Sequence, residues 1–156
     1  MTTSLLRNVS AETLMGELSR FQAEGGADPT VRRLAELAVW QKDDQIAGIY
    51  DFVKNTFPYL PDPIHYEFFI HPRLMAENYF AGYIRGADCD DHALLASAML
   101  RSLGYEAKVL LVDSAGNGEI DHALAQVNTP IGWVNVDTVA NCPLGWQFNY
   151  RIAVPV

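Results

Sequence analysis

The sequence predicts an α+β fold in which helices come first and an antiparallel sheet follows. Apolar residues recur with a helical period of about 3.6 along much of the first half of the chain. After the helix that follows residue 88, short alternating segments bounded by turn residues indicate strands. Segregation of helices and strands in this order is typical of the α+β class. The length of 156 residues favours a single domain with a core of its own.

The composition indicates a globular protein and excludes several classes of function. Hydrophobic residues make up 49% of the chain, and the net charge is −8. A role in binding nucleic acid is disfavoured because phosphate recognition needs clustered Lys and Arg. The chain has no run of about 18 apolar residues and no basic-then-apolar leader, so we expect no membrane span and a cytoplasmic location. A domain of this size needs no disulfide, so we expect Cys89 and Cys142 to be free thiols.

Three helices are predicted before residue 57. Ser10 is suited to cap the first, which Gly25-Gly26 ends, and Asp28-Pro29 starts the second. Asp43 or Asp44 starts the third. The apolar residues expected to face inward are Leu14, Leu18, Phe21, Val31, Leu34, Leu37, Ala38, Trp40, Ile46, Ile49, Tyr50 and Val53.

The middle of the chain is less regular. Residues 57–63 contain three prolines and are expected to form a loop. Residues 64–85 are ambiguous, and we interpret them as loop with one helical turn at about 73–79. A further helix is then predicted from Cys89 to Leu103, with Gly104 at its C-terminal cap.

The strands are expected at residues 108–113, 122–128 and 133–139, separated by the turn segments 114–118 and 129–132. Residues 151–156 are predicted to form an edge strand, because Pro155 cannot donate to a ladder.

Cys89 is the candidate nucleophile. Asp88 is suited to cap the helix and Asp91 lies three residues further on, so Cys89 falls at about the first helical position. The helix dipole at this end favours a thiolate, whereas the charges of Asp88, Asp90 and Asp91 disfavour it. The sequence leaves the sign of the net effect open, so activation must depend more on a neighbouring imidazolium than on the helix. Cys89 by itself is equally compatible with an ordinary buried cysteine.

His122 and Asp137 strengthen the functional interpretation. If residues 129–132 close a hairpin, Asp137 lies opposite Leu124, and His122 and Asp137 become diagonal neighbours on one face. Their Cβ atoms are then expected within about 7 Å, which allows a hydrogen bond. A register slip of one residue would separate them. The sequence therefore predicts a His–Asp pair on adjacent strands.

Other polar residues compete with this interpretation. His92 follows Cys89 by three residues and is expected near it, while His65 and His71 lie in the irregular region. The ligand types for a metal are present around residues 88–92 and 121–122, but no Cys-x-x-Cys or His-x-x-x-His spacing occurs. We therefore expect no metal and no cofactor.

With these residues, the chain resembles a transglutaminase-like domain of the papain-like cysteine protease superfamily. The resemblance rests on Gly86-Ala-Asp-Cys-Asp-Asp-His-Ala, Leu100-Arg-Ser-Leu-Gly-Tyr-Glu-Ala, Asp121-His-Ala and Trp133-Val-Asn-Val-Asp137. It covers roughly residues 35–140 of a single domain at 1–156, with residues 1–30 as an added helical element.

The resemblance implies a Cys–His–Asp triad formed by Cys89, His122 and Asp137. It also implies an oxyanion donor upstream of the cysteine, for which Tyr83, Asn78 and Tyr79 are candidates, while Asp88, Asp91 and His92 would lie close to the site. The activity would be thiol-dependent acyl transfer or amide hydrolysis on a peptide or protein substrate. The alternative is a silent binding or assembly protein, such as a phage or bacterial structural component associated with a virion. The sequence leaves the substrate and the oligomeric state open.

Overall fold

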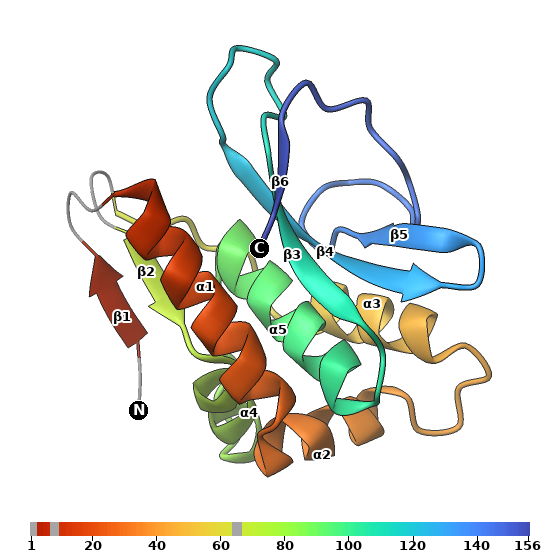
Figure 1. The fold of residues 1–156 in the computed structure, drawn as a ribbon. Coiled ribbons are helices and arrows are strands. Elements are labelled where there is room, and N and C mark those ends of the chain that lie inside the picture. The colour runs from red at the N-terminus through yellow and green to blue at the C-terminus, as the bar shows by residue number, and fades with distance from the viewer. Residues whose placement is uncertain (1–2, 7–9, 64–66) are drawn as a thin grey trace.

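The computed structural model describes residues 3–6, 10–63 and 67–156 and confirms the α+β class (Figure 1). The helices are α1 (Ala11–Gly26), α2 (Pro29–Ala38), α3 (Gln45–Thr56), α4 (Pro72–Phe80) and α5 (Cys89–Ser102). The strands are β1 (Thr3–Leu6), β2 (Glu67–Ile70), β3 (Ala107–Val112), β4 (His122–Thr129), β5 (Gly132–Val136) and β6 (Ala153–Pro155).

The predicted helix starts are confirmed by side-chain caps. Ser10 accepts a hydrogen bond from the amide of Thr13, Asp28 accepts one from Thr30, and Asp44 accepts one from Ala47. Each cap satisfies an amide that the first helical turn cannot pair internally. Gly104 follows α5 with a φ of +94°, the left-handed conformation that glycine tolerates best.

The main sheet has the strand order β5-β4-β3-β6, and every pair in it is antiparallel. Asn128 lies opposite Trp133 and Ala125 lies opposite Val136, so the hairpin register predicted from the sequence is confirmed. The predicted C-terminal edge strand is also confirmed, as β6 pairs with β3. β1 and β2 form a separate antiparallel pair.

Helix α5 is the centre of the fold. Figure 1 shows it between α1 and the strands β3 and β4, with α2, α3 and α4 around its other sides. Its Leu94, Leu95, Met99 and Leu100 side chains are fully buried. The burial of this helix on all sides fixes the position of its first residue, Cys89, relative to the sheet.

A buried amide connects α1 to this centre. The Oε1 atom of Gln22 accepts hydrogen bonds from Ser97 Oγ at 2.9 Å, Val109 N at 3.0 Å and Arg101 Nη2 at 3.1 Å. Its Nε2 atom donates to the carbonyl of Val156 at 3.1 Å. Because Gln22 is fully buried, these bonds specify how α1 sits on α5 and the sheet.

The prediction for residues 64–85 is wrong at residues 67–70, which form β2 and not a loop. The helical segment expected at 73–79 is confirmed, and α4 extends it by one residue at each end. His71 caps α4 by accepting from the amide of Arg73, and Pro72 occupies the first helical position. Residues 64–66, including His65, lie outside the described residues.

Three smaller corrections concern two side chains near the end of α2 and the end of β5. Trp40 is 72% exposed and not inward-facing, because α2 ends at Ala38 and Gln41 takes a φ of +56°. Leu37, also expected inward, is exposed. The strand expected at 133–139 ends at Val136, because the Asp137 carboxylate accepts hydrogen bonds from the amides of Val139 and Ala140 and turns the chain.

Among the described residues, no helix is both long and apolar enough to cross a membrane.

Candidate active site

Cys89 is the first residue of α5 and is held there by a capping box. The Asp88 carboxylate accepts from the amide of Asp91 at 3.3 Å, and the Asp91 carboxylate accepts from the amide of Asp88 at 3.4 Å. The amide of Cys89 lies between these two and is not part of the box. It is therefore placed to donate to a group next to the thiol.

The segment before the helix is tied to the loop at 57–63. The amide of Leu60 donates to the carbonyl of Ala87 at 2.9 Å, and the amide of Ala87 donates to that of Pro58 at 3.0 Å. A Cβ atom at Gly86 would lie 2.9 Å from the Leu60 side chain, so only glycine fits this approach. This contact brings the loop alongside the start of α5.

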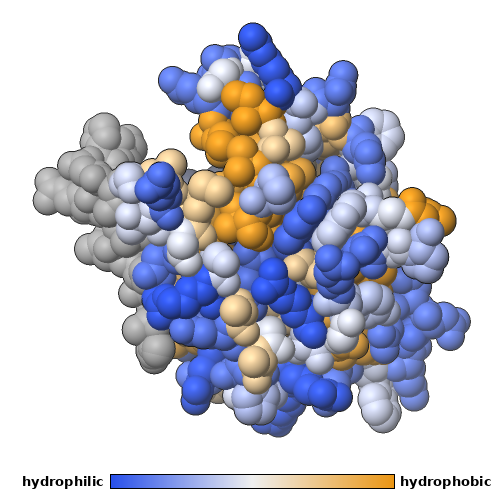
Figure 2. Space-filling model, in the orientation of Figure 1, coloured by the Kyte–Doolittle hydropathy of each residue, from blue (hydrophilic) through white to orange (hydrophobic). Residues whose placement is uncertain are grey.

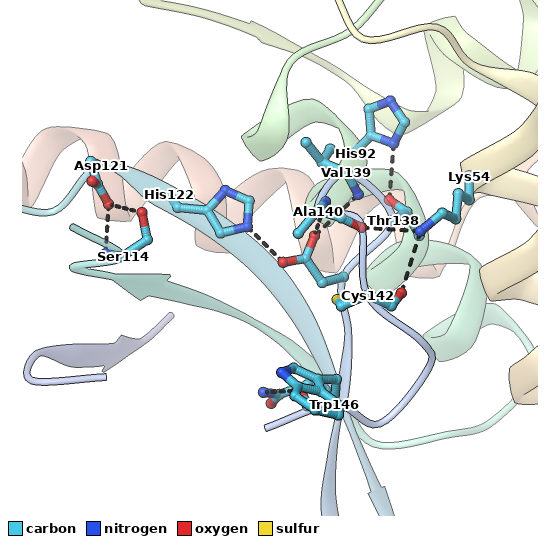
Figure 3. A network of polar contacts seen from close by, with 12 residues as sticks. Lys54, His92, Ser114, Asp121, His122, Thr138, Val139, Ala140, Cys142 and Trp146 are labelled. Carbon is cyan, nitrogen blue, oxygen red and sulfur yellow. Dashed lines mark hydrogen bonds and ion pairs between the residues drawn. The ribbon is translucent and has the colours of Figure 1, made fainter. Parts of the chain in front are cut away.

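His122 and Asp137 form the pair predicted from the register. Nε2 of His122 lies 2.7 Å from Oδ2 of Asp137 (Figure 3). Burial alone would raise the pKa of Asp137, but the His122 ring and the amides of Ala140 and Val139 outweigh it and lower that pKa. The ionised carboxylate can only accept, so Nε2 carries the proton. In the neutral ring Nδ1 is therefore an acceptor.

The loop that follows Asp137 is held by residues that the sequence analysis missed. The Lys54 ammonium donates to the carbonyls of Ala140 at 3.0 Å and Cys142 at 3.4 Å, and the Tyr50 hydroxyl donates to the Cys142 carbonyl at 2.5 Å. Figure 3 shows Lys54 reaching this loop from α3. Lys54 and Tyr50 are four residues apart on one helix face, which was the signal available in the sequence.

A single cavity of about 300 Å³ brings Cys89 and His122 together. Cys89 packs against an apolar cluster that includes Ala123, and the Ala123 amide faces the thiol. In the part of the chain that the structure describes, no hydrogen bond joins Cys89 to His122. His122 is the first residue of β4, so its ring sits at the end of the strand, and catalytic contacts in a free enzyme are often looser than in a complex.

The structure decides the electrostatic question that the sequence left open. Burial raises the pKa of the Cys89 thiol to about 12, and the charges of Asp90 and Asp88 add to the effect. The amides of Ala123 and Asp90 act in the opposite direction and are weaker. The resting thiol is therefore protonated at neutral pH, and the helix dipole does not produce a thiolate.

Asp62, Asp88 and Asp91 form the group among the described residues that could hold a metal ion. One carboxylate oxygen from each lies within 4.8 Å of the others. Backbone amides already use two of these carboxylates: Ile70 donates to Asp91 at 2.7 Å and Phe68 donates to Asp62 at 2.5 Å. Burial, together with Asp88 and Glu67, raises the pKa of Asp62 to about 6. These hydrogen bonds give the cluster a structural role: Asp91 joins α5 to β2, and Asp62 joins the loop at 57–63 to β2.

His92, expected near the thiol, does not line the cavity that contains Cys89. Its Nδ1 lies 2.9 Å from Thr138 Oγ1, and its Nε2 is buried without a hydrogen bond and faces the Phe57 carbonyl. Burial lowers the pKa of His92 to about 4. His92 therefore supports the Asp137 loop as a neutral ring.

His71, which the sequence placed in the irregular region, is buried away from this cavity. Its Nε2 atom lies 3.0 Å from Oε2 of Glu24.

The three candidate oxyanion donors also lie outside the lining of this cavity. Tyr83 is 60% exposed, Tyr79 packs edge-on against Phe52, and the Asn78 carbonyl accepts from the Tyr83 amide. A different tyrosine, Tyr59, is 56% exposed and also lies outside this lining, but its backbone adjoins that of Ala87, two residues before Cys89. Its pKa is raised by burial and then by the charges of Cys89, Asp88, Asp90 and Asp62, and it pairs with Ala87 in an isolated bridge.

A second cavity of about 500 Å³ lies on the other side of the His122–Asp137 pair. Its lining includes Asp113, Phe148, Tyr150 and Arg151, from the β3–β4 loop and the C-terminal segment. Burial and the charges of Asp137, Cys142 and Asp121 raise the pKa of Tyr150 to about 12. The imidazole thus borders two separate spaces, only one of which contains the thiol.

The chain matches the transglutaminase-like superfamily over residues 31–138, which is more than half of its length. No curated protein matches it. Among solved structures, it is similar to a candidate cysteine protease from Cytophaga hutchinsonii, with a TM-score of 0.56 and 16% identity over 92% of this chain and 52% of that one. It is also similar to a candidate protease from Parabacteroides distasonis, with a TM-score of 0.53 and 14% identity over 81% of this chain and 26% of that one. The chain spans about half or less of these proteins, and at such identities the likeness shows the fold alone.

Proposed function

Because the chain belongs to the transglutaminase-like superfamily, we propose that it catalyses cysteine-dependent acyl transfer or amide hydrolysis. Cys89 is the nucleophile, His122 the general base and acid, and Asp137 the residue that orients the ring. One observation carries the proposal: the His122 ring, fixed by its 2.7 Å contact with Asp137, lines the same cavity as Cys89.

In the first half of the reaction, Cys89 Sγ attacks the carbonyl carbon of a peptide or protein amide. His122 Nδ1 takes the thiol proton as the S–C bond forms, and the C=O electron pair moves onto oxygen. When this intermediate collapses, the C–N bond breaks and the amine leaves with the proton from His122. A thioester on Cys89 and a free amine are the products of this half-reaction.

In the second half, water or an amine attacks the thioester. His122 takes a proton from the attacking group, the C–S bond breaks, and the proton returns to Cys89. Water as the acceptor gives hydrolysis, and an amine gives transfer.

Two groups are suited to stabilise the oxyanion of the intermediate. The amide of Cys89 lies at the positive end of α5 and outside the capping box. The hydroxyl of Tyr59 is the second candidate, because Tyr59 pairs with Ala87, two residues before Cys89. Loss of one such donor typically costs about 10²–10³ in kcat.

A binding or assembly protein without turnover is the second candidate. The observation that favours it is the burial of Cys89 next to Asp90 and Asp88, which together hold the thiol in its protonated form. Such a protein would keep the fold and use the cavities for recognition.

The test uses a small activated acyl donor, 4-nitrophenyl acetate, with intact-mass and peptide mapping of the adduct. We expect acetylation of Cys89 and its slow release, with Cys142 unmodified. Cys142→Ala serves as the matched control, because this second free thiol lies outside both cavities. His122→Ala is expected to slow acetylation of Cys89 by about 10²–10⁴, the usual contribution of a general base.

Two results would overturn the proposal and leave the assembly protein ahead. One is acetylation of Cys142 as fast as that of Cys89. The other is an unchanged rate of Cys89 acetylation in His122→Ala and in Asp137→Asn, with both variants shown to be folded by their near-ultraviolet spectra.

A further inference from the structure

The cavity that contains Cys89 has an apolar wall that the family match does not include. Leu14, Met15 and Leu18 of α1 line it, and α1 precedes the matched residues 31–138. Phe69 of β2 and Leu111 of β3 continue the apolar surface. Figure 2 shows apolar residues gathered on this face between α1 and the strands β3 and β6. An apolar group next to the scissile carbonyl would remove this surface from water.

The polar side of the same cavity is lined by carboxyl groups. Glu67, Asp88, Asp90 and Asp121 belong to its lining, which contains no lysine or arginine among the described residues. Asp88 and Asp90 flank the thiol directly in the chain. The Oδ1 atom of Asp90 is buried and has no hydrogen-bond partner. Burial, followed by the neighbouring carboxyl groups of Asp88, Asp91 and Glu67, raises the pKa of Asp90 well above its usual range. A cation placed against the carboxyl groups that line the cavity would therefore favour their ionised forms.

We propose that this cavity selects acyl donors that combine an apolar side chain with a free α-ammonium group, such as the N-terminal apolar residue of a peptide. The proposal rests on the proposed function of Cys89. The side chain lies against the α1 wall, and the ammonium donates to Asp90 and its neighbours. The position of the charges favours an α-ammonium, which is two bonds from the reacting carbonyl, over the distant ammonium of a lysine side chain.

The contact between the ammonium and the carboxylates should also favour ionisation of the Cys89 thiol during acylation. Burial, followed by the charges of Asp90 and Asp88, keeps the Cys89 thiol protonated, as its pKa of about 12 shows. An ammonium seated between these carboxylates offsets their charge at the moment when the thiol must ionise. The preference for a free amine should therefore appear in the acylation rate as well as in binding.

The experiment compares leucine 4-nitrophenyl ester with its N-acetyl counterpart, each corrected for its uncatalysed rate and measured in the presence of EDTA. We expect kcat/KM for the free amine to exceed that of the acetylated ester by at least about tenfold, consistent with a charge-assisted hydrogen bond. Glycine 4-nitrophenyl ester tests the apolar wall and should be a poorer donor than the leucine ester.

Two variants assign the preference to the cavity. Asp90→Asn should reduce the preference for the free amine to less than about threefold, because the amide cannot balance an ammonium charge. Asp51→Asn removes an exposed carboxylate of α3 outside the cavity and should leave the preference unchanged.

The outcomes separate this inference from the function on which it rests. Equal rates for the two leucine esters, a preference for the acetylated ester, or an unchanged preference in Asp90→Asn would overturn the inference alone. Loss of activity in EDTA with recovery on adding Ca²⁺ would also overturn it, because a metal ion would then occupy the carboxylates. Failure of every donor, including 4-nitrophenyl acetate, to acylate Cys89 would overturn the proposed function as well.

Discussion

Acid should destabilise this protein through His92. The ring is 2% exposed, and its pKa falls from 6.5 to about 4 on folding, with burial as the main cause. The charges of Asp88 and Asp137 act against this shift and are weaker. A base whose pKa is lower in the folded state contributes stability above its unfolded pKa, and this stability is lost as the pH falls toward the folded value.

The expected magnitude follows from the size of the shift. At about 1.4 kcal/mol per unit, the change from 6.5 to about 4 corresponds to about 3 kcal/mol in full. Between about pH 7 and about pH 5, roughly 2 kcal/mol of this should be lost. The reference is His92→Asn, whose amide can keep the hydrogen bond to Thr138 but does not titrate.

The measurement is the free energy of unfolding by urea at a series of pH values, followed by tryptophan fluorescence. Carboxylates with raised pKa values titrate in both proteins and cancel in the difference. The wild type should lose about 2 kcal/mol more than His92→Asn over this range. Parallel curves, differing by less than about 0.5 kcal/mol across the range, would show that His92 accepts a proton easily in the folded protein and would refute the reasoning.

Four further predictions use the same unfolding measurement or the thiol. Gln22→Leu should cost about 3 kcal/mol or more, because it leaves the buried donors of Ser97 and Val109, the half-buried Arg101 and the Val156 carbonyl without their partner. A loss below about 1 kcal/mol would contradict this role. Gly25→Ala should destabilise, since its Cβ would lie 2.9 Å from both the Ala98 and Pro72 side chains, whereas Gly16→Ala in the same helix meets nothing within 4 Å and should stabilise by about 0.5–1 kcal/mol. Asp62→Asn should raise the melting temperature most above about pH 6 and have little effect at about pH 4, because a carboxyl whose pKa rises from 3.8 to about 6 on folding loses stability as the pH rises between these two values; an equal effect at both pH values would argue against the shift. Asp90→Asn should lower the pH at which Cys89 reacts with iodoacetamide, and an unchanged profile would leave burial and Asp88 as the causes of the raised thiol pKa.

The parts of the fold that could be predicted from the sequence are those with local causes. Ser10, Asp28, Asp44 and Asp88 each cap a helix because a short polar side chain can reach the amides two or three residues later. The hairpin register followed from a two-residue loop between Thr129 and Gly132, and this register placed Asp137 within reach of His122.

The parts that could not be predicted depend on contacts between distant segments. β2 pairs with β1, which lies more than sixty positions earlier in the chain, so no local turn sequence predicts this pairing. The α1 wall beside Cys89 depends on how α1 packs on α5, which the buried bonds of Gln22 fix. His92 shares α5 with Cys89 and follows it by three residues. At this N-terminal end of the helix, Cys89 faces the cavity whereas His92 faces Thr138.

The start of α5 shows why geometry and thiol acidity conflict in this site. Asp88 and Asp91 form the capping box that makes Cys89 the first helical residue, so the charges that position the nucleophile also surround it. Asp88 contributes directly to the raised thiol pKa, and replacing it would remove the cap. A preformed thiolate–imidazolium pair is therefore disfavoured here. Catalysis in such a site requires proton transfer to His122 as the S–C bond forms, which makes the 2.7 Å contact between His122 and Asp137 more important than the helix dipole.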